Sequence, residues 1–401
     1  MRYAVVDAVW KLARTVAGRR LVQGNGVVST SNGPLPQGSF LLLANHAHAY
    51  DPYVIGSLLG RPVRYMANLE GVSPVFAAFS GLAGAFGKRK GMPDLSALRT
   101  ALRYLKDGEP VGIFPEGDRS WDGRTAGINP GIARLARMAG VPIVLARQRG
   151  SYLSFPRWAK VRRKGRWTID FSVIEAGRVA SGSVGDLVRE IQQGLDNDDP
   201  AEASSSGLRF SCKAPARGIS RALWACPHCG SVGRTIDDDT TIHCLACGST
   251  WIVDANCGIR TISGHAGDFI GRPAFGWNSD RRADIHTWIV WQRAYAGALI
   301  GTGSSWRVSS RVPGLARLGP GRPVYYGSGL LSISSAALFF KPDSDSRTIA
   351  LELTRVEGFI DNFNQYCAFN YGKERWKLDH GSAFPLMWID LVEAARNNIG
   401  H

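Results

Sequence analysis

Residues 39–174 alternate short apolar runs with segments of helical periodicity, and this alternation constrains the fold more than any other feature. Strands and helices that alternate along a chain fold as an α/β layer structure, in which helices cover the faces of a sheet. We therefore expect a mixed sheet flanked by helices. The expected strands are 39–44, 111–114, 141–147 and 166–174, and the expected helices are a segment from 52, 95–107 and 130–139.

The chain has 401 residues, enough for two or three domains. The α/β pattern belongs to an expected first domain at 1–196. Small and polar residues at 197–220 predict a linker. Beyond it we expect a cysteine-rich segment at 221–257, a helical or irregular connector at 258–324, and a β-rich region at 325–401 that ends in a helix.

A histidine and an aspartate stand at the start of the second expected element. His46 and Asp51 follow the first strand, and Asp51-Pro52 has the sequence of a helix start, with Asp at the N-cap and Pro at the first helical position. An imidazole can accept a proton near neutral pH, and a carboxylate on its other nitrogen fixes its tautomer. The pair is a candidate general base; taken alone, a His and an Asp at this spacing in a loop more often form a surface hydrogen bond.

Three further segments carry functional potential. Residues 114–120 read Phe-Pro-Glu-Gly-Asp-Arg-Ser directly after a strand, which places Glu116 and the Gly117 backbone at a sheet edge where α/β enzymes bind substrates. A Lys-Arg-Lys triplet between glycines at 84–91 could hold a phosphate. Residues 140–144 form a Gly-Val-Pro-Ile-Val strand after a helix. Individually, the first two are also typical of a capped turn and a solvated loop.

In this order and spacing, the four segments resemble the glycerolipid (lysophosphatidate) acyltransferase family over roughly residues 1–190. Asn45, His46 and Asp51 match its Asn-His-x-x-x-x-Asp block, and residues 114–120 match its Phe-Pro-Glu-Gly-Thr-Arg-Ser block except that Asp118 replaces Thr. The Val-Pro-Ile-Val strand matches a further block.

Three further positions depart from the family pattern. The family's second block would place Asp and then a phosphate-binding Arg where this chain has Arg89 and Lys90. A lysine lacks the bidentate grip of a guanidinium, so Arg89 is expected to share the role. His48 stands where Ser is common, and we expect a polar loop residue, with a second catalytic role as the alternative.

The resemblance implies transfer of a fatty acyl group from acyl-CoA or acyl carrier protein to the free hydroxyl of 1-acylglycerol-3-phosphate, forming phosphatidic acid. It implies His46 as the general base and Asp51 as its orienting acid. It assigns phosphate binding to Arg89 and Lys90, and binding of the glycerol part to Glu116 and Gly117. It also places Arg119 among the substrate-binding residues. Another lysolipid or amino-lipid acceptor is the alternative in the same class, and a non-catalytic lipid-binding scaffold is the alternative of another class.

Two Cys-x-x-Cys pairs, separated by fourteen residues, have the spacing of a zinc ribbon. We expect one structural zinc ion, with disulfides or a redox pair as the alternatives. The expected ligands are Cys226, Cys229, Cys244 and Cys247. Cys212, Cys257 and Cys367 have no partner spacing and are expected to be ordinary buried or free thiols.

The net charge of +15 is concentrated in the first half of the chain. Residues 1–196 carry 27 Lys and Arg against 14 Asp and Glu, whereas residues 197–401 carry 21 against 19. The first half therefore meets an anionic partner: anionic lipid, a phosphorylated substrate or nucleic acid. The small positive net charge of the second half argues against nucleic acid, which we do not expect as a partner. Protein partners are left open.

Two cationic segments predict contact with a membrane surface. Residues 1–20 could form an amphipathic helix, whose alternative is packing on its own domain. Residues 147–166 combine eight cations with aromatic residues and no acid, a pattern that suits a bilayer surface, the phosphates of acyl-CoA or nucleic acid, or else a solvated hairpin. No apolar stretch is long enough for a membrane span, and no signal peptide is recognisable. We expect a peripheral protein on the cytoplasmic face of the membrane.

The strands and final helix of 325–401 resemble a pleckstrin-homology-like barrel in topology alone, without a diagnostic motif. An accessory role in membrane or partner docking is the expected function of this region.

Overall fold

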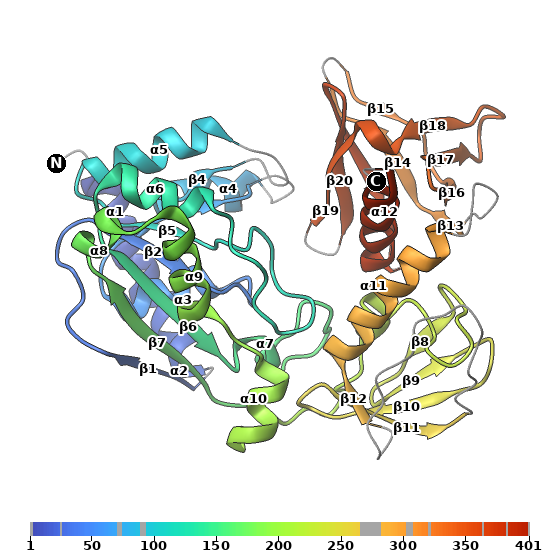
Figure 1. The fold of residues 1–401 in the computed structure, drawn as a ribbon, viewed down its shortest axis with the longest axis horizontal. Coiled ribbons are helices and arrows are strands. Elements are labelled where there is room, and N and C mark those ends of the chain that lie inside the picture. The colour runs from blue at the N-terminus through green and yellow to red at the C-terminus, as the bar shows by residue number, and fades with distance from the viewer. Residues whose placement is uncertain are drawn as a thin grey trace. The chain divides into compact units, whose positions relative to one another are not determined.

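The computed structural model describes residues 3–24, 26–69, 74–88, 94–264, 282–301, 308–319, 322–362, 365–381 and 384–399. It divides into two compact units, one formed by Met1–Arg157 with Arg162–Cys212 and the other by Trp158–Val161 with Lys213–His401. The first unit contains the predicted α/β pattern, and the second contains the cysteine-rich and β-rich regions (Figure 1).

The described strands of the first unit form a seven-stranded mixed sheet. Neighbouring strands are parallel, except that β6 and β7 are antiparallel. The expected mixed sheet with flanking helices is thereby confirmed. In spatial order the strands are β1 (Val27–Ser31), β7 (Trp167–Ile174), β6 (Ile143–Arg149), β2 (Leu41–Ala44), β5 (Val111–Ile113), β3 (Arg64–Ala67) and β4 (Phe86–Gly87).

Strand β2 lies inside the sheet and is buried on both faces, which explains its continuous apolar sequence. Leu41 and Leu43 belong to one hydrophobic core, and Phe40 and Leu42 belong to the other, because successive side chains point to opposite faces. Helices α5 (Leu95–Lys106), α6 (Gly131–Ala139), α8 (Ala176–Ser181) and α9 (Val184–Leu195) line the first core, whereas α2 (Arg19–Gly24) and α3 (Asp51–Leu59) line the second.

The helix ends follow local sequence signals with one correction. The carboxylate of Asp94 accepts the Ala97 N–H at 3.1 Å and caps α5, as predicted. Helix α3 begins one residue earlier than predicted: Tyr50 is its N-cap and Asp51 its first residue. The prediction of Asp51 as N-cap was wrong because its carboxylate binds groups that precede the helix.

The N-terminal segment consists of α1 (Ala4–Ala13), a π-helical turn at Arg14–Gly18 and α2. Trp10 is buried, so part of the segment packs on its own unit. Leu12 and Val16 are 65% and 53% exposed. Among the described residues, no helix combines the length and the apolar character needed to cross a bilayer.

The segment predicted as a linker is folded over part of its length. It contains α10 (Asp199–Ser206), and residues as far as Cys212 belong to the first unit. Asp199 is buried and binds the backbone of Gly150 and Tyr152. These contacts could not be predicted from the local sequence, because they join one carboxylate to backbone amides about 50 residues away.

The cysteine-rich part of the second unit includes an antiparallel five-stranded sheet; Cys244 ends one of its strands, and the other three cysteines of the two pairs lie outside the strands. The last two strands of this sheet extend beyond 257 into the segment predicted as a connector. The strands, in spatial order, are β12 (Arg282–Asp284), β11 (Gly258–Ser263), β10 (Thr250–Val253), β9 (Thr241–Cys244) and β8 (Thr235–Asp237).

Two further antiparallel sheets follow α11 (Ile285–Gly301). One contains β13 (Val308–Val312), β16 (Gly329–Ile333), β17 (Ala337–Pro342) and β18 (Ile349–Glu352) in that order. The other contains β15 (Val324–Tyr325), β14 (Gly314–Arg317), β21 (Glu374–Asp379), β20 (Tyr366–Tyr371) and β19 (Val356–Asn362). The chain passes from β13 to β14 across Pro313 and so joins both sheets, and α12 (Pro385–Ile399) follows. This topology is compatible with the predicted barrel, which stays a prediction.

A buried polar network links the elements of the second unit. Asp390 in α12 accepts hydrogen bonds from Trp224 Nε1 at 2.8 Å and from Arg293 Nε at 3.1 Å. Asp390 is 3% exposed, and the guanidinium of Arg293 compensates its charge. The segment before the first cysteine pair, α11 and α12 are therefore held together by one carboxylate.

Candidate functional site

Three parallel strands end at one edge of the first sheet. Strands β2, β5 and β6 run in the same direction, so the loops after their carboxyl ends meet there. The loop after β2 carries His46, the loop after β5 carries Glu116, and β6 is followed by α7 (Ser151–Ser154). The sheet thus brings together residues that are about 70 and 100 positions apart in the sequence.

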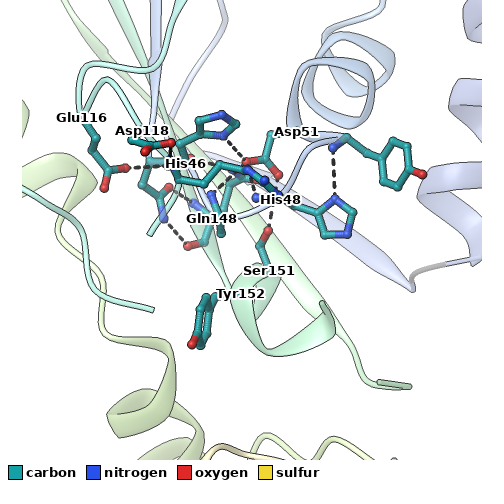
Figure 2. Close-up of polar contacts among 12 residues, drawn as sticks. His46, His48, Asp51, Glu116, Asp118, Gln148, Ser151 and Tyr152 are labelled. Carbon is teal, nitrogen blue, oxygen red and sulfur yellow. Dashed lines mark hydrogen bonds and ion pairs between the residues drawn. The ribbon is translucent and has the colours of Figure 1, made fainter. Parts of the chain in front are cut away.

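His46 and Asp51 form the predicted pair. His46 Nδ1 lies 2.9 Å from Asp51 Oδ2, and the two side chains are turned toward each other in Figure 2. The histidine side chain is 20% exposed and the aspartate side chain is fully buried. Because Nδ1 faces the carboxylate, it carries the proton of the neutral ring, and Nε2 is the nitrogen that can accept one.

Asp51 also organises the loop in which His46 lies. Its Oδ2 accepts the backbone N–H groups of Ala47 at 3.0 Å and His48 at 2.9 Å. The Ser151 hydroxyl lies 3.5 Å from its other oxygen. These donors satisfy a carboxylate that has no access to solvent, so the orientation of the acid is fixed before any substrate binds.

The surroundings of His46 favour its neutral form. Its ring stacks on Phe114, with centroids 4.0 Å apart. Burial lowers the pKa of His46 below its usual value; Asp51 opposes this shift, and the positive charge of Arg119 adds to it. The imidazole is therefore unprotonated at neutral pH, the state that a general base requires.

Glu116 supports the same loop from the side opposite Asp51 (Figure 2). Its Oε1 accepts the His46 N–H at 2.6 Å, and its Oε2 accepts the Ala126 N–H at 2.8 Å. Burial raises the pKa of Glu116 to about 8, and the two amide bonds oppose the shift. Both oxygens thus contact the backbone, a role that the sequence did not indicate. Gly117 is exposed and has a φ of +79°, a turn conformation that favours glycine.

Asn45 and Gln148 join the loop to β6 through three hydrogen bonds. Asn45 Nδ2 donates to the Gln148 carbonyl at 2.9 Å, the Gln148 N–H donates to Asn45 Oδ1 at 2.7 Å, and Gln148 Nε2 donates to the Asn45 carbonyl at 2.7 Å. Both side chains are buried. Sequence reasoning missed Gln148, which stands between Arg147 and Arg149 at the polar end of β6, where the sequence gives no sign that this side chain is buried.

Asp199 fixes the segment that follows β6. Its carboxylate accepts the Gly150 N–H at 2.6 Å and the Tyr152 N–H at 2.8 Å, and so holds the start of α7, which contains Ser151. Burial raises the pKa of Asp199 to about 6. This residue also escaped the sequence analysis, because it lies in the segment predicted as a linker.

The predicted substrate-binding residues are only partly described. Arg119 lies close enough to His46 for its charge to affect the pKa of that ring, and its carbonyl accepts a hydrogen bond from Arg157 at 2.9 Å. Arg157 also pairs with Asp118 at 2.9 Å. Arg89 and Lys90 lie outside the described residues.

His48 is a buried ring. It is 3% exposed, and its Nδ1 accepts the Tyr50 N–H at 3.0 Å. Burial lowers the pKa of His48 to about 4, with a smaller opposing effect from Asp51. The ring packs near Tyr50, Phe155 and Trp167. This arrangement supports a packing role in the loop.

The four cysteines of the two pairs lie together in the second unit. Their sulfurs lie within 4.8 Å of one another, and the Cys226–Cys247 and Cys229–Cys244 separations are 3.8 and 3.6 Å. A tetrahedral zinc site with Zn–S bonds of ~2.3 Å requires sulfurs roughly 3.8 Å apart, whereas a disulfide requires about 2.05 Å. The Cys229 N–H also points to Cys226 Sγ at 3.4 Å. The group could hold a zinc ion.

A second cluster contains Asp361, Cys367 and His380, which are all buried. His380 Nε2 lies 3.2 Å from Asp361 Oδ1, and its Nδ1 lies 3.0 Å from the Gly381 carbonyl. Cys367 was predicted to be an ordinary buried thiol, and it is indeed buried. Among the described residues, these two clusters have the ligand types and spacing that a metal ion needs.

Comparison with known proteins agrees with this site. Residues 23–145 match the family model described as Acyltransferase. A probable 1-acyl-sn-glycerol-3-phosphate acyltransferase of Mycoplasma genitalium is 28% identical over 141 residues, which cover 33% of this chain and 53% of that protein. The 1-acyl-sn-glycerol-3-phosphate acyltransferase of Bacillus subtilis is 30% identical over 129 residues, which cover 32% of this chain and 63% of that protein.

Among solved structures, the 1-acyl-sn-glycerophosphate acyltransferase PlsC of Thermotoga maritima matches with a TM-score of 0.39 and 20% identity, over 46% of this chain and 76% of that chain. The chain spans less than two thirds of the length of either curated relative. The family model and the two curated relatives indicate an acyltransferase-like segment within the matched part of the chain.

Proposed function

We propose that this chain, with its acyltransferase-family domain at residues 23–145, transfers a fatty acyl group from an acyl thioester to the free hydroxyl of 1-acylglycerol-3-phosphate, forming phosphatidic acid. The observation that carries the proposal is the neutral His46 held by Asp51 at the sheet edge. The names of the matched relatives support the choice of acceptor. The donor is acyl-CoA or acyl carrier protein.

His46 Nε2 acts as the general base in this mechanism. It accepts the proton of the acceptor hydroxyl while the hydroxyl oxygen attacks the thioester carbonyl. The O–H bond breaks and an O–C bond forms; collapse of the tetrahedral intermediate then breaks the C–S bond. The protonated imidazole returns the proton to the leaving thiolate, and Asp51 stabilises the imidazolium between the two steps. No enzyme nucleophile is needed.

The test is acyl transfer to a panel of lysolipids by the wild type and by His46→Ala. We expect turnover of 1-acylglycerol-3-phosphate by the wild type and a loss of ~10² to 10⁴-fold in the variant. Met138→Ala is the control, because Met138 is 67% exposed on α6. Wild-type turnover confined to another lysolipid would change the acceptor, and no turnover with any acceptor would favour the scaffold alternative.

One structural zinc ion at the four cysteines is the second part of the proposal. Thiolate ligands at the observed separations support it. Elemental analysis of the purified full chain should give one zinc per chain, and a chelator should lower the melting temperature. Cys226→Ser should lose the metal. A zinc-free chain with unchanged stability would contradict this part.

A peripheral location at the membrane surface is the third part. Leu12 and Val16 are exposed apolar side chains next to exposed Lys11, Arg19 and Arg20. Such a combination binds anionic lipid through apolar insertion and charge. Binding to vesicles that contain an anionic phospholipid should weaken in a Leu12→Ser, Val16→Ser variant; binding that is unchanged would exclude this surface.

A further inference from the structure

The basic run at 147–166 does not form a uniform cationic surface. Three of its arginines are paired with carboxylates that lie elsewhere in the sequence: Arg147 with Glu202 at 2.5 Å, Arg149 with Asp170 at 2.7 Å, and Arg157 with Asp118 at 2.9 Å. The absence of acids within the run therefore does not mean that its charges lack partners. These three cations are less available to a phosphate or to a lipid head group.

Arg162 has different surroundings. Its guanidinium carbon lies 5.0 Å from the centre of the Tyr50 ring and 5.5 Å from that of Phe155. Arg162 is exposed, and within the described part of the chain no carboxylate pairs with it. Two aromatic faces hold a guanidinium in place without neutralising its charge. The cation is thus oriented and still able to bind an anion.

Of the two aromatic residues that hold Arg162, Tyr50 belongs to the loop of the candidate base and Phe155 follows α7. The rings of Tyr50 and Phe155 lie 4.9 and 5.6 Å from the His48 ring, and the Tyr50 N–H binds His48 Nδ1. His48 is two residues from His46. The charges of Arg162 and Arg119 both lower the pKa of His48, after the larger effect of burial, so both cations lie near this ring. A neutral His48 does not repel them.

We propose that Arg162, together with Arg119, binds a phosphate group of a substrate beside the His46 loop. The inference rests on the proposed function and extends it to a cation outside the four matched segments. The phosphate belongs either to the acceptor, as its phosphomonoester, or to the donor, as a phosphate of coenzyme A. Contact of Arg162 with a membrane surface is the competing explanation.

Binding measurements on the full chain test this proposal independently of turnover. Isothermal titration with glycerol 3-phosphate and with coenzyme A compares the wild type, Arg162→Gln, Arg162→Lys and the control Arg166→Gln, an exposed arginine of the same segment. We expect Arg162→Gln to lower the affinity for one of the two ligands by about 10 to 100-fold, the effect of losing a hydrogen bond to a charged group. Arg162→Lys should lose less affinity, and Arg166→Gln should bind both ligands as tightly as the wild type.

The ligand for which the affinity falls identifies the substrate that supplies the phosphate. Glycerol and pantetheine, the phosphate-free counterparts, should show no difference between the wild type and Arg162→Gln. In turnover assays the variant should raise KM for the same substrate and leave kcat within about threefold, since the base is intact.

Two results would overturn the proposal. One is equal binding of both phosphate ligands by the wild type and Arg162→Gln; the other is loss of vesicle binding alone, which would assign Arg162 to the membrane surface. Failure of the proposed function has a different signature: the wild type would transfer no acyl group to any acceptor, whatever its affinity for the phosphate ligands.

Discussion

Among the described residues, the histidine–aspartate pairs His46–Asp51 and His380–Asp361 differ in what each ring leaves available. In the first unit, Asp51 binds His46 Nδ1, and within the described residues Nε2 has no bonding partner. In the second unit, Asp361 faces His380 Nε2 while Gly381 faces Nδ1, and the ring is 1% exposed. The same two residue types thus give a candidate base at a sheet edge and a closed contact inside a β-rich unit. A histidine can exchange protons with a substrate only where one nitrogen is left free and accessible.

Replacing one histidine by alanine should reduce activity and replacing the other should reduce stability, and these are the largest effects we expect. His46→Ala should abolish most acyl transfer with little change in melting temperature. His380→Ala should lower the free energy of unfolding by about 3–5 kcal/mol, because it removes a buried ring that faces Asp361, and should leave kcat of the folded protein near the wild-type value. Activity assays and thermal denaturation measure both. A stable, inactive His380→Ala would contradict the assignment.

Changing the orienting acid should reduce activity less than removing the base. Asp51→Asn can donate to His46 Nδ1 and would then hold the ring with its proton on Nε2, so we expect a loss on the order of 10²-fold in kcat. Asp51 raises the pKa of His46, so its removal lowers that pKa further. Because the protonated ring is inactive, the acidic limb of the residual kcat/KM profile should move to lower pH. A shift to higher pH would show that Asp51 does not stabilise the imidazolium.

Glu116→Gln separates a positioning role from substrate binding. Above pH 8, where Glu116 is ionised, both of its oxygens accept a hydrogen bond. An amide has one acceptor oxygen, so at that pH either the His46 N–H or the Ala126 N–H loses its partner in the variant, at a cost of about 1–3 kcal/mol in unfolding free energy. If Glu116 positions the loop, kcat falls and KM for the acceptor stays constant. If it binds the glycerol part, as the sequence predicted, KM rises. Steady-state kinetics distinguish the two.

The raised pKa of Glu116 also predicts a pH dependence of stability. The pKa is about 8 in the folded protein, above the usual value of 4.5, so the stabilisation from its protonated form is complete below pH 4.5. It is lost as the pH rises from 4.5 to about 8. Denaturant titrations of the wild type should show this loss, and Glu116→Gln should not; equal slopes in both proteins would contradict the shift.

Gln148→Ala should have the smallest effect on kcat. It removes the bond from Gln148 Nε2 to the Asn45 carbonyl, while the Gln148 backbone keeps its two bonds to the Asn45 side chain. We expect a loss of about 1–3 kcal/mol in unfolding free energy and a modest decrease in kcat. Chemical denaturation and kinetics measure this. A KM effect without a kcat effect would mean that Gln148 contacts substrate.

The parts of the molecule that could be predicted are those whose signals are local. The helix cap at Asp94, the alternation of strands and helices, and the pairing of His46 with Asp51 depend on residues within a few positions of one another. The cysteine pairs were predictable for the same reason, because the two cysteines of each pair are only three positions apart. The start of α3 was misplaced because the same local signal, an Asp before Pro, fits two roles of the carboxylate.

The sequence by itself therefore determined the α/β class of the first unit, the pairing of His46 with Asp51, and the grouping of four thiols. Only the tertiary structure decided that Glu116 binds the His46 backbone, that Gln148 and Asp199 fix neighbouring loops, and that Arg162 stands apart from the paired arginines. The physical reason is distance along the chain. Parallel strands bring their carboxyl ends to one edge, so the contacts that orient the site join residues 47 to 103 positions apart, and no local pattern records them.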